Sequence, residues 1–333
     1  MARRLKVSTR VTSTALVVAV SLVVLGSVLP GGAATPADVA PLPNAARGPA
    51  IPQDKGYLVR EIKDGLYWVT DGVYQVMFLT TGQGVIAVDA PPSLAGKYQK
   101  AIAEVTKEKV THVIYSHTHK DHIGSARIFK GAKYIGHRDA AATLARAKDP
   151  DRPVPTITFA RSYVLKVGRQ TLNLDYRGPN HEPGNIFIYA PRQKVLMLVD
   201  VIFPGWVPFM QLALAKDVPG FVAAHQQALS YPFETFIGGH MNRLGTRQDV
   251  RTQMEYVTDL KANASKALQT VDFMGVARET GFENSWLLFD RYFAAVTKTC
   301  ADLTVPKWRS RLGGADVWTQ SHCLQMVVSL RID

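Results

Sequence analysis

The sequence predicts an α/β protein in which two stacked β-sheets carry helices on their outer faces. Apolar strand-like runs recur in two groups over residues 55–260, and helical segments separate many of them. In addition, one buried strand ends in a dense group of histidine and aspartate side chains, at the place where α/β sheets usually hold ligands. With 333 residues, 47% of them hydrophobic, the chain can bury a substantial core.

The first 34 residues have the order of an export signal. Four basic residues fall within the first ten positions, before an apolar run over 15–29 and small residues at 31–34. An uncleaved membrane anchor is the alternative, but the apolar run is short for a span. We therefore expect residues 1–34 to be a signal peptide. The mature protein would then be secreted or extracytoplasmic, in the periplasm or cell envelope, without a stable membrane span.

Three further regions follow the expected signal. Residues 35–54 are crowded with Pro and Ala, which predicts an extended linker. Residues 55–260 are expected to form the main domain, and residues 261–333 a helical C-terminal extension. Thr246, with Asp249 three residues later, has the pattern of a helix N-cap, and apolar residues at helical spacing follow it.

The strands and helices of the main domain can be placed in order. Runs at 65–70 and 74–80 flank the turn signal Asp71-Gly72, which predicts a hairpin. A third strand ends at Asp89, and an amphipathic helix over 97–107 follows it. Next come a strand at 110–115, a short helix at 126–129, a strand at 133–136 and a helix at 138–148. The second group of strands is expected at 162–166, 170–175, 185–189, 194–199 and 236–239.

Charge and cysteine content narrow the class of partner. The formal net charge is +12, and four of the cations belong to the first segment. The remaining excess favours anionic surfaces or substrates in a general way. Lys and Arg are spread without a basic stripe, so nucleic-acid binding is not indicated. In an exported protein, Cys300 and Cys323 predict one disulfide, the alternative being two unpaired buried thiols.

Four ligand-type side chains fall within six residues after the strand at 110–115. They are His117, His119, Asp121 and His122. Neutral imidazoles buried together would lack donors for their lone pairs, and protonated ones would repel one another. A divalent metal removes both problems, because imidazole nitrogen and carboxylate oxygen are ligands that zinc takes. We therefore expect a metal site rather than a histidine-rich surface loop.

Three more candidate ligands lie at other strand ends. His181 is in a turn between two predicted strands, and Asp200 follows the apolar strand at 194–199. His240 follows a strand that ends in two glycines, which allow the backbone to approach a ligand closely.

With these residues in place, the chain from about residue 56 to about residue 260 resembles the metallo-β-lactamase superfamily. That family shares a His-x-His-x-Asp-His loop, then a His, an acidic or Cys ligand and a final His, and every position is filled here. The resemblance implies a four-layer αβ/βα sandwich over 55–260, with two zinc ions at one edge of the sheets. One zinc would be held by His117, His119 and His181, the other by Asp121, His122 and His240, with Asp200 bridging both.

The resemblance also implies a hydrolase. A hydroxide bridging the metals would attack an ester, lactone, thioester, amide or phosphoester of a small molecule. Asp121 would be the catalytic residue that orients this hydroxide and passes a proton to the leaving group. Asp200 is more typical of the lactonase, thioesterase and phosphodiesterase branches than of β-lactamases. His119 disfavours the flavin-associated di-iron branch, which has Glu there. The alternatives are a mononuclear iron-dependent sulfur or oxygen oxidoreductase, a β-lactamase with atypical ligands, and a binding protein without activity.

Residues around the expected ligands keep two interpretations each. Asp89 either orients the metal-binding loop or is a simple turn acid, and Lys120 either contacts an anionic substrate or is solvated. Trp206 and Phe209 either wall the pocket or pack on their own loop. Arg243 either clamps a carboxylate or phosphate or forms a surface salt bridge.

Overall fold

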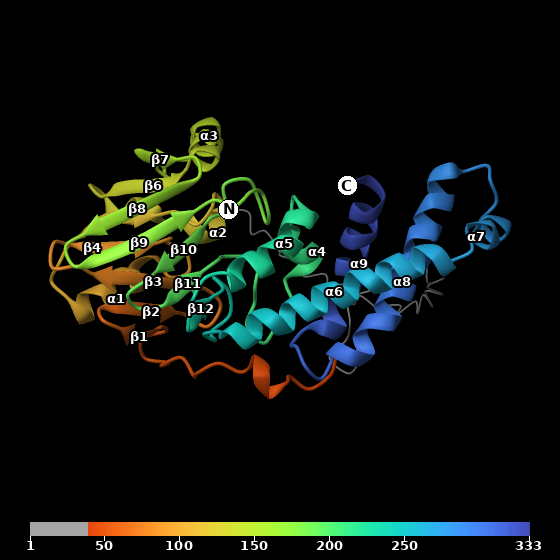
Figure 1. Cartoon of the computed structure of the whole chain (residues 1–333), viewed down its shortest axis with the longest axis horizontal. Helices are drawn as coiled ribbons and strands as arrows, with labels where there is room; N and C mark the ends of the chain where they lie inside the picture. Colours follow the sequence, from red (N-terminus) through yellow and green to blue (C-terminus); the bar gives the residue numbers. More distant parts are fainter. Residues whose placement is uncertain (1–38) are drawn as a thin grey trace, which may run out of the picture. The chain divides into compact units, whose positions relative to one another are not determined.

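The first sheet has seven strands in sequence order, β1 to β7 (Figure 1). This computed structural model describes residues 39–333, so the expected signal peptide lies outside the described residues. The first four strands run antiparallel and β4 to β7 run parallel. Their bounds are β1 (Leu58–Lys63), β2 (Leu66–Thr70), β3 (Gln75–Thr80), β4 (Val85–Val88), β5 (Val110–Ile114), β6 (Lys133–His137) and β7 (Ile157–Phe159).

Local sequence explains this change of direction along the sheet. The β1–β2 turn has positive φ at Asp64 and Gly65, the backbone that a tight two-residue hairpin requires. Asp71 accepts hydrogen bonds from the backbone N–H groups of Val73 and Tyr74, which closes the β2–β3 turn. After β4, helix α1 (Ala95–Val105) crosses back, so β5 pairs parallel with β4.

The second sheet has five strands in the order β12-β11-β10-β9-β8. All neighbours are antiparallel except β11 and β12, which are parallel. Its strands are β8 (Ser162–Val167), β9 (Gln170–Asp175), β10 (Phe187–Ala190), β11 (Val195–Met197) and β12 (Thr235–Ile237).

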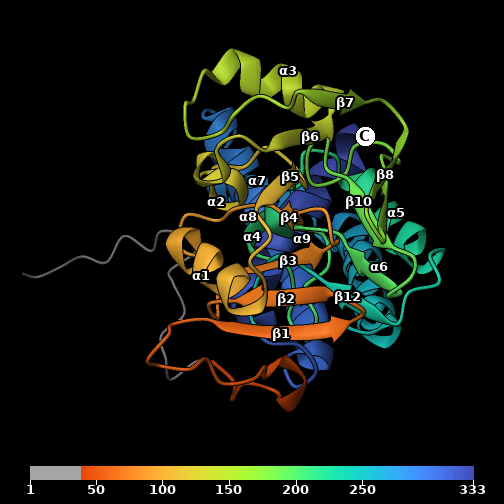
Figure 2. The same cartoon turned by 90° about the vertical axis from the view of Figure 1, so that its left-hand side faces the viewer.

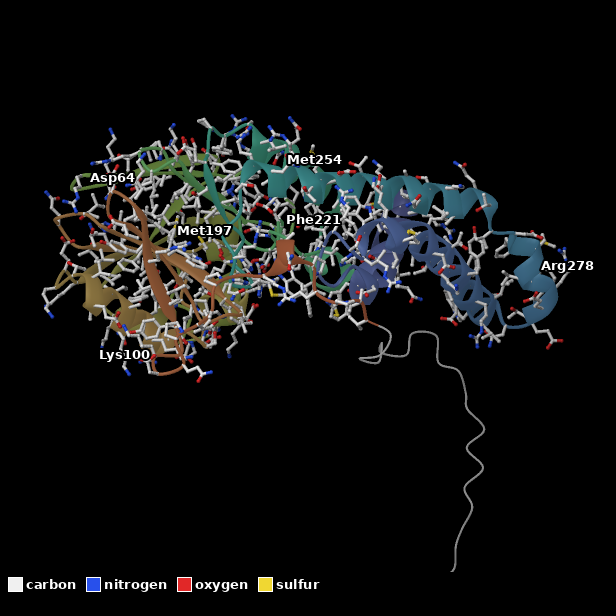
Figure 3. All side chains as sticks on the ribbon, turned by 90° about the horizontal axis from the view of Figure 1, so that it is seen from below. Asp64, Lys100, Met197, Phe221, Met254 and Arg278 are labelled. Atoms are coloured by element: carbon white, nitrogen blue, oxygen red, sulfur yellow. A yellow bond between two sulfur atoms is a disulfide. The ribbon has the colours of Figure 1, made fainter. Side chains whose placement is uncertain are left out.

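Three apolar clusters separate the layers. The central one joins the two sheets, with Trp68 and Met77 packed near Met197, which Figure 3 labels. A second cluster covers the outer face of the first sheet with α1, α3 (Arg138–Ala147) and the short helices α2 (Lys120–Ile123) and η2 (Ala126–Phe129). Figure 2 shows α1 and α3 beside this sheet. The third cluster covers the second sheet with α5 (Val218–Leu229) and the later helices. The predicted four-layer α/β sandwich is therefore confirmed.

The C-terminal region is helical, as predicted. It comprises α6 (Arg247–Thr270), α7 (Phe273–Thr280), α8 (Ser285–Trp308) and α9 (Ala315–Ile332). Thr246 and Asp249 form a capping box at the start of α6, so the predicted N-cap is present. Cys300 and Cys323 form a disulfide that joins α8 to α9. The boundary expected between residues 260 and 261 falls inside α6, so one continuous helix belongs to both the main domain and the extension.

The segment before β1 is docked on the rest of the protein. Residues 44–46 form a 3-10 turn, and the carbonyl of Ala46 accepts a hydrogen bond of 2.9 Å from the indole of Trp206. Asn242 donates to the carbonyl of Pro49, and the N–H of Ala40 donates to Asp316 on α9. This part of the expected linker is therefore held between α9 and the loops near β11 and β12.

No helix among the described residues has the length and apolar character needed to cross a membrane. Strands β1 and β7, the short α2 and the turn α4 (Met210–Leu214) had no counterpart among the sequence predictions.

Candidate metal centre

Adjacent strand ends deliver the predicted ligands to one edge of the two sheets. Strand β5 ends at Ile114, and the loop that follows carries His117 before α2 begins at Lys120. His119 has an extended backbone at the start of α2. The short helix therefore begins directly after His119 and contains Asp121 and His122, which explains how four ligand-type side chains can converge from six residues.

The second sheet supplies three more side chains. His181 lies in the loop between β9 and β10, and Asp200 follows β11 with a positive φ of 62°. His240 follows β12 directly after Gly239, whose φ is 89°. A Cβ at Gly239 would lie 2.6 Å from Cγ1 of Val199, so only glycine lets the two strand ends run this close. The side chain of Gln75 also donates a hydrogen bond to the carbonyl of His240.

All seven predicted ligands come together. They form two groups of potential donors, each within 4.8 Å of one another: His117, His119, His181 and Asp200 in one, and Asp121, His122 and His240 in the other.

Asp200 lies between the two groups. Its Oδ2 atom is 3.4 Å from Nε2 of His117, 3.3 Å from Nε2 of His181 and 3.2 Å from Nε2 of His122. Its Oδ1 atom is 3.1 Å from Nε2 of His240. One carboxylate thus faces imidazoles of both groups.

The donor atoms fit divalent cations. Nε2 of His181 lies 2.9 Å from Nδ1 of His119, and Nε2 of His122 lies 3.0 Å from Nε2 of His240. A tetrahedral zinc with Zn–N bonds of 2.0–2.1 Å holds two nitrogens about 3.3 Å apart, so both pairs need only a small adjustment. Among the described residues, the buried Nε2 of His117 and Oδ1 of Asp200 have no hydrogen-bond partner, as expected for atoms that face a cation.

The protonation of the cluster agrees with this. Burial lowers the pKa of His181 to about 3 and also lowers that of His119, so both imidazoles keep a free lone pair at neutral pH. Burial alone would raise the pKa of Asp200, but the surrounding His122, His240 and His181 hold it well below its usual range. His122 differs: burial would lower its pKa, but Asp200 and Asp121 raise it to about 9, so a metal would have to displace its proton. The centre thus combines the neutral imidazoles of His181 and His119 with the ionised carboxylate of Asp200, which are donors that zinc accepts.

Carboxylates behind the cluster orient its histidines. Asp89 is buried with a positive φ of 57° and accepts hydrogen bonds from the backbone N–H and hydroxyl of Ser116, at 2.8 and 2.7 Å. The Ser116 hydroxyl lies 2.9 Å from Nδ1 of His117. Asp89 therefore supports the metal-binding loop through Ser116, in agreement with the first of its two interpretations.

Glu182 has the same kind of position next to His119. Its Oε1 accepts hydrogen bonds from the backbone and hydroxyl of Thr118, and its Oε2 lies 3.4 Å from Nε2 of His119. Burial would raise the pKa of Glu182, but His117 and His119 lower it to about 2. The carboxylate is therefore ionised and can accept the proton of the His119 nitrogen that faces away from the cluster.

The metallo-beta-lactamase superfamily model matches residues 69–240, just over half of the chain. The chain belongs to this superfamily. Among curated relatives, it is 26% identical over 193 residues to the 2,4-dinitroanisole O-demethylase subunit alpha of Nocardioides sp. (strain JS1661), covering 56% of this chain and 58% of that protein. It is 27% identical over 152 residues to a metallo-beta-lactamase type 2 of Elizabethkingia meningoseptica, covering 42% and 59%. The chain thus spans less than two thirds of the length of these relatives.

Solved structures of the superfamily share the fold. A metallo-beta-lactamase from Pontibacter korlensis superposes with a TM-score of 0.52 at 19% identity, over 60% of this chain and 97% of that one. The metallo-beta-lactamase IND-7 superposes with a TM-score of 0.51 at 17% identity, over 60% and 98%. About two fifths of this chain therefore lies outside the part it shares with either structure.

Tyr74 is a site residue that the sequence analysis missed. Its hydroxyl lies 3.3 Å from Oδ2 of Asp121, and its ring packs on those of His122 and His240. Burial, with Asp121 next in importance, raises the pKa of Tyr74 to about 12, so the phenol remains a hydrogen-bond donor at neutral pH. Sequence alternation indicates only a strand position for this tyrosine, which carries no signal of its function.

A cavity of about 560 Å³ opens from the metal centre. Trp206 and Phe209 line it, so their interpretation as pocket walls holds. The C-terminal helix α9 adds Val317 and Trp318 to its lining. The loop between β11 and α5 adds Ala213 and Leu214 to the lining. They end a turn over residues 211–214, in which four consecutive non-glycine residues have φ between 52° and 58°. Such a left-handed turn costs about 1–2 kcal/mol per residue, so the surrounding contacts must hold it in place.

Other polar residues singled out in the sequence lie outside this cavity lining. Arg243 pairs with Asp249 at 2.8 Å, so the salt-bridge interpretation holds rather than a substrate clamp. Lys120 has an exposed side chain that lies 3.7 Å from Asp149. A further histidine outside the lining, His225, is buried in α5 and forms a hydrogen bond with Gln253.

Proposed function

We propose that the protein is a hydrolase that holds two zinc ions and cleaves an ester, lactone, thioester or related bond of a small molecule. The observation that carries the proposal is the position of Asp200 between two groups of imidazoles, in the lining of one cavity. A site with three donors and no shared carboxylate would favour a single metal instead.

His117, His119 and His181 would hold one ion, Asp121, His122 and His240 the other, and Asp200 both. When bound, these ions would lower the pKa of water and polarise the oxygen of the scissile group. Side chains of the protein would transfer the protons of the reaction. Among the carboxylates of the cluster, Asp121 has the more exposed side chain, and its Oδ2 can accept a proton from the attacking water and pass it to the leaving group. Tyr74 holds that carboxylate in position through its hydroxyl.

The protein is further proposed to act outside the cytoplasm. The charged, apolar and small-residue order of residues 1–34 supports export, and the Cys300–Cys323 disulfide suits an oxidising compartment. Residues 55–260 would be the catalytic domain and 261–333 its helical extension.

A second candidate is release of a methyl group from an aromatic ether. One relative is named as a 2,4-dinitroanisole O-demethylase, and aromatic side chains line the cavity of this chain. An iron-dependent oxidoreductase on the same fold is distinguished from both by its metal.

The test is elemental analysis of the purified protein together with a panel of ester, lactone, thioester, phosphodiester, β-lactam and anisole substrates. We expect two zinc ions per chain and hydrolysis that a chelator abolishes. Asp121→Asn should lower kcat by about 10²–10⁴-fold, the usual contribution of a positioned acid or base. Asp64→Asn is the matched control, because its side chain is 40% exposed against 45% for Asp121 and lies at the β1–β2 turn. One iron per chain without hydrolysis, or full activity in Asp121→Asn, would contradict the proposal.

A further inference from the structure

Helix α9 adds a wall to the cavity from outside the part of the chain that the family model matches. The match ends at residue 240, whereas Val317 and Trp318 lie on α9. The interpretation of this wall rests on the proposed function, because it concerns what the same centre would cleave.

Hydrogen bonds fix α9 to the loop between β11 and α5, which also lines the cavity. His322 Nε2 lies 2.9 Å from the carbonyl of Phe209, and the amide of Gln325 donates to the carbonyl of Ala215. The hydroxyl of Ser321 accepts from the backbone N–H of Gln211, the first residue of the left-handed turn. The helix and the loop therefore form one wall rather than two independent parts.

The walls present flat aromatic surfaces. The rings of Phe209 and Trp318 pack edge to face with centroids 5.1 Å apart. Trp206 lies against Gly313, where a Cβ would come within 2.6 Å of its ring, and its indole N–H is held by Ala46. Because their positions are fixed by these contacts, the aromatic side chains favour a flat apolar group over a flexible one.

The lining also lacks positive side chains. None of the described residues that line this cavity is Lys or Arg, while Asp121 and Asp200 are among them. The cations near the site are paired elsewhere: Lys216 with Glu182 at 3.3 Å, Lys120 with Asp149 at 3.7 Å and Arg243 with Asp249 at 2.8 Å. A negatively charged group in the apolar part of the cavity would lose its hydration without gaining a partner, so the cavity disfavours the anionic substrate suggested by the overall charge.

We propose that the substrates are uncharged aryl esters, and that Trp318 and Val317 on α9 select them. Hydrolysis adds water across the acyl–oxygen bond. The water oxygen bonds to the acyl carbon, the bond to the aryloxide breaks, and one proton of the water passes to the leaving aryloxide, which gives a carboxylic acid and a phenol. The aryl group lies against Trp318, while the ester group faces the metal centre.

The substrate test compares phenyl acetate with 4-acetoxybenzoate, which differs by one carboxylate. For each ester, kcat/KM of the zinc-loaded protein is divided by the rate constant of its hydrolysis by hydroxide without protein, which corrects for intrinsic reactivity. We expect this corrected value to be at least tenfold higher for phenyl acetate than for 4-acetoxybenzoate. Val317→Lys should reduce this ratio at least fivefold, because it places a cation in the cavity wall. Leu324→Lys is the control, since Leu324 lies on the same helix, is 38% exposed against 40% for Val317, and is not part of the cavity lining.

A binding test separates this inference from the proposed function. Acetophenone has a similar flat apolar shape and no hydrolysable bond, and 4-acetylbenzoate is its charged counterpart. Titration calorimetry with the zinc-loaded protein should give tighter binding of acetophenone by about tenfold. Trp318→Ala should weaken that binding, and Trp318→Phe should retain most of it.

The outcomes are distinct. Selective acetophenone binding without hydrolysis of any substrate in the panel would support the aromatic cavity but overturn both the hydrolase and the assignment of aryl esters as its substrates. Hydrolysis with equal rates for the two esters, or a Val317→Lys variant that behaves like Leu324→Lys, would overturn the inference and leave the hydrolase in place.

Discussion

Asp89 accepts two hydrogen bonds from one residue, Ser116, whose hydroxyl in turn lies 2.9 Å from Nδ1 of His117. The carboxylate, the hydroxyl and the imidazole form a chain that fixes the orientation of His117 from the side opposite the metal-binding nitrogen. Burial raises the pKa of the Asp89 carboxyl, and the nearby His122 and His117, together with the hydrogen bonds from Ser116, offset only part of that rise.

We expect Asp89→Asn to weaken metal binding by about 10–100-fold, the usual effect of losing such a supporting contact. Asparagine tolerates the positive φ at this position, so the backbone should not change. The measurement is zinc content after dialysis against a series of zinc buffers. Asp64→Asn, also at a positive φ but exposed, should retain its metal. Unchanged zinc affinity in Asp89→Asn would mean that Ser116 alone orients the loop.

Tyr74→Phe removes the hydroxyl that contacts Asp121 and leaves the ring that packs on His240. A hydrogen bond to a charged group is typically worth about 1.5–3 kcal/mol. The bond from Tyr74 to Asp121 is long, at 3.3 Å, and therefore weaker, so we expect kcat to fall by only about 3–10-fold. Zinc content should not change. Tyr67→Phe on the neighbouring strand is the control. A loss of zinc together with kcat would show that the tyrosine acts on the metal-binding side chains rather than on proton handling.

Acid should destabilise the fold partly through His322. Burial lowers the pKa of His322 to about 4, from an ordinary value of 6.5. Above pH 6.5 the imidazole is neutral in both states, so it adds no pH dependence. Between pH 6.5 and 4 the unfolded chain binds a proton that the folded protein excludes, so the free energy of unfolding falls by about 1.4 kcal/mol per pH unit for this residue.

The measurement is urea unfolding from pH 7.5 to 4.5 of the wild type and of His322→Gln. The slope of stability against pH should be smaller in the variant, because its unfolded state gains no proton at this position. His112→Gln is the comparison: His112 is half-buried on β5, so its removal should change the slope less. Equal slopes for His322→Gln and wild type would rule out this source of acid sensitivity.

The disulfide should stabilise the extension. Cys300 and Cys323 are separated by 23 positions in the sequence, and closing a loop of this length is worth about 3 kcal/mol in the chain-entropy treatment. Replacing both cysteines by serine should lower the urea midpoint accordingly, and dithiothreitol should lower that of the wild type alone. Insensitivity of the wild type to the reductant, with an intact bond, would instead indicate that α8 and α9 are held by their packing.

The candidate ligands, which the structure brings together, could be predicted because most of them lie close together in the sequence. His117, His119, Asp121 and His122 lie within six positions, and strand ends mark the places of Asp200 and His240. The helical extension and the disulfide were also predictable, from apolar periodicity and from the cysteine count.

The part of the cavity wall that α9 and the turn at 211–214 supply could not be predicted in the same way. Trp318 meets Phe209 only through the packing of α9, and an aromatic residue on a helix equally indicates a core position. The turn at 211–214 consists of Gln, Leu, Ala and Leu, residues that favour a right-handed helix, so no local preference indicates its left-handed backbone. Glu182 and Tyr74 are single residues whose roles depend on neighbours from other elements.

Helix α9 is synthesised after all the candidate ligands, because it lies near the C-terminal end of the sequence. Trp318 comes 78 residues after His240, so at about 5–20 residues per second the ribosome needs several seconds more to deliver it. During that interval the nascent chain contains every candidate ligand but lacks the wall that Val317 and Trp318 add to the cavity. Discrimination between substrates would therefore mature later than the capacity to bind metal, and in an oxidising compartment it would mature alongside formation of the bond between α8 and α9.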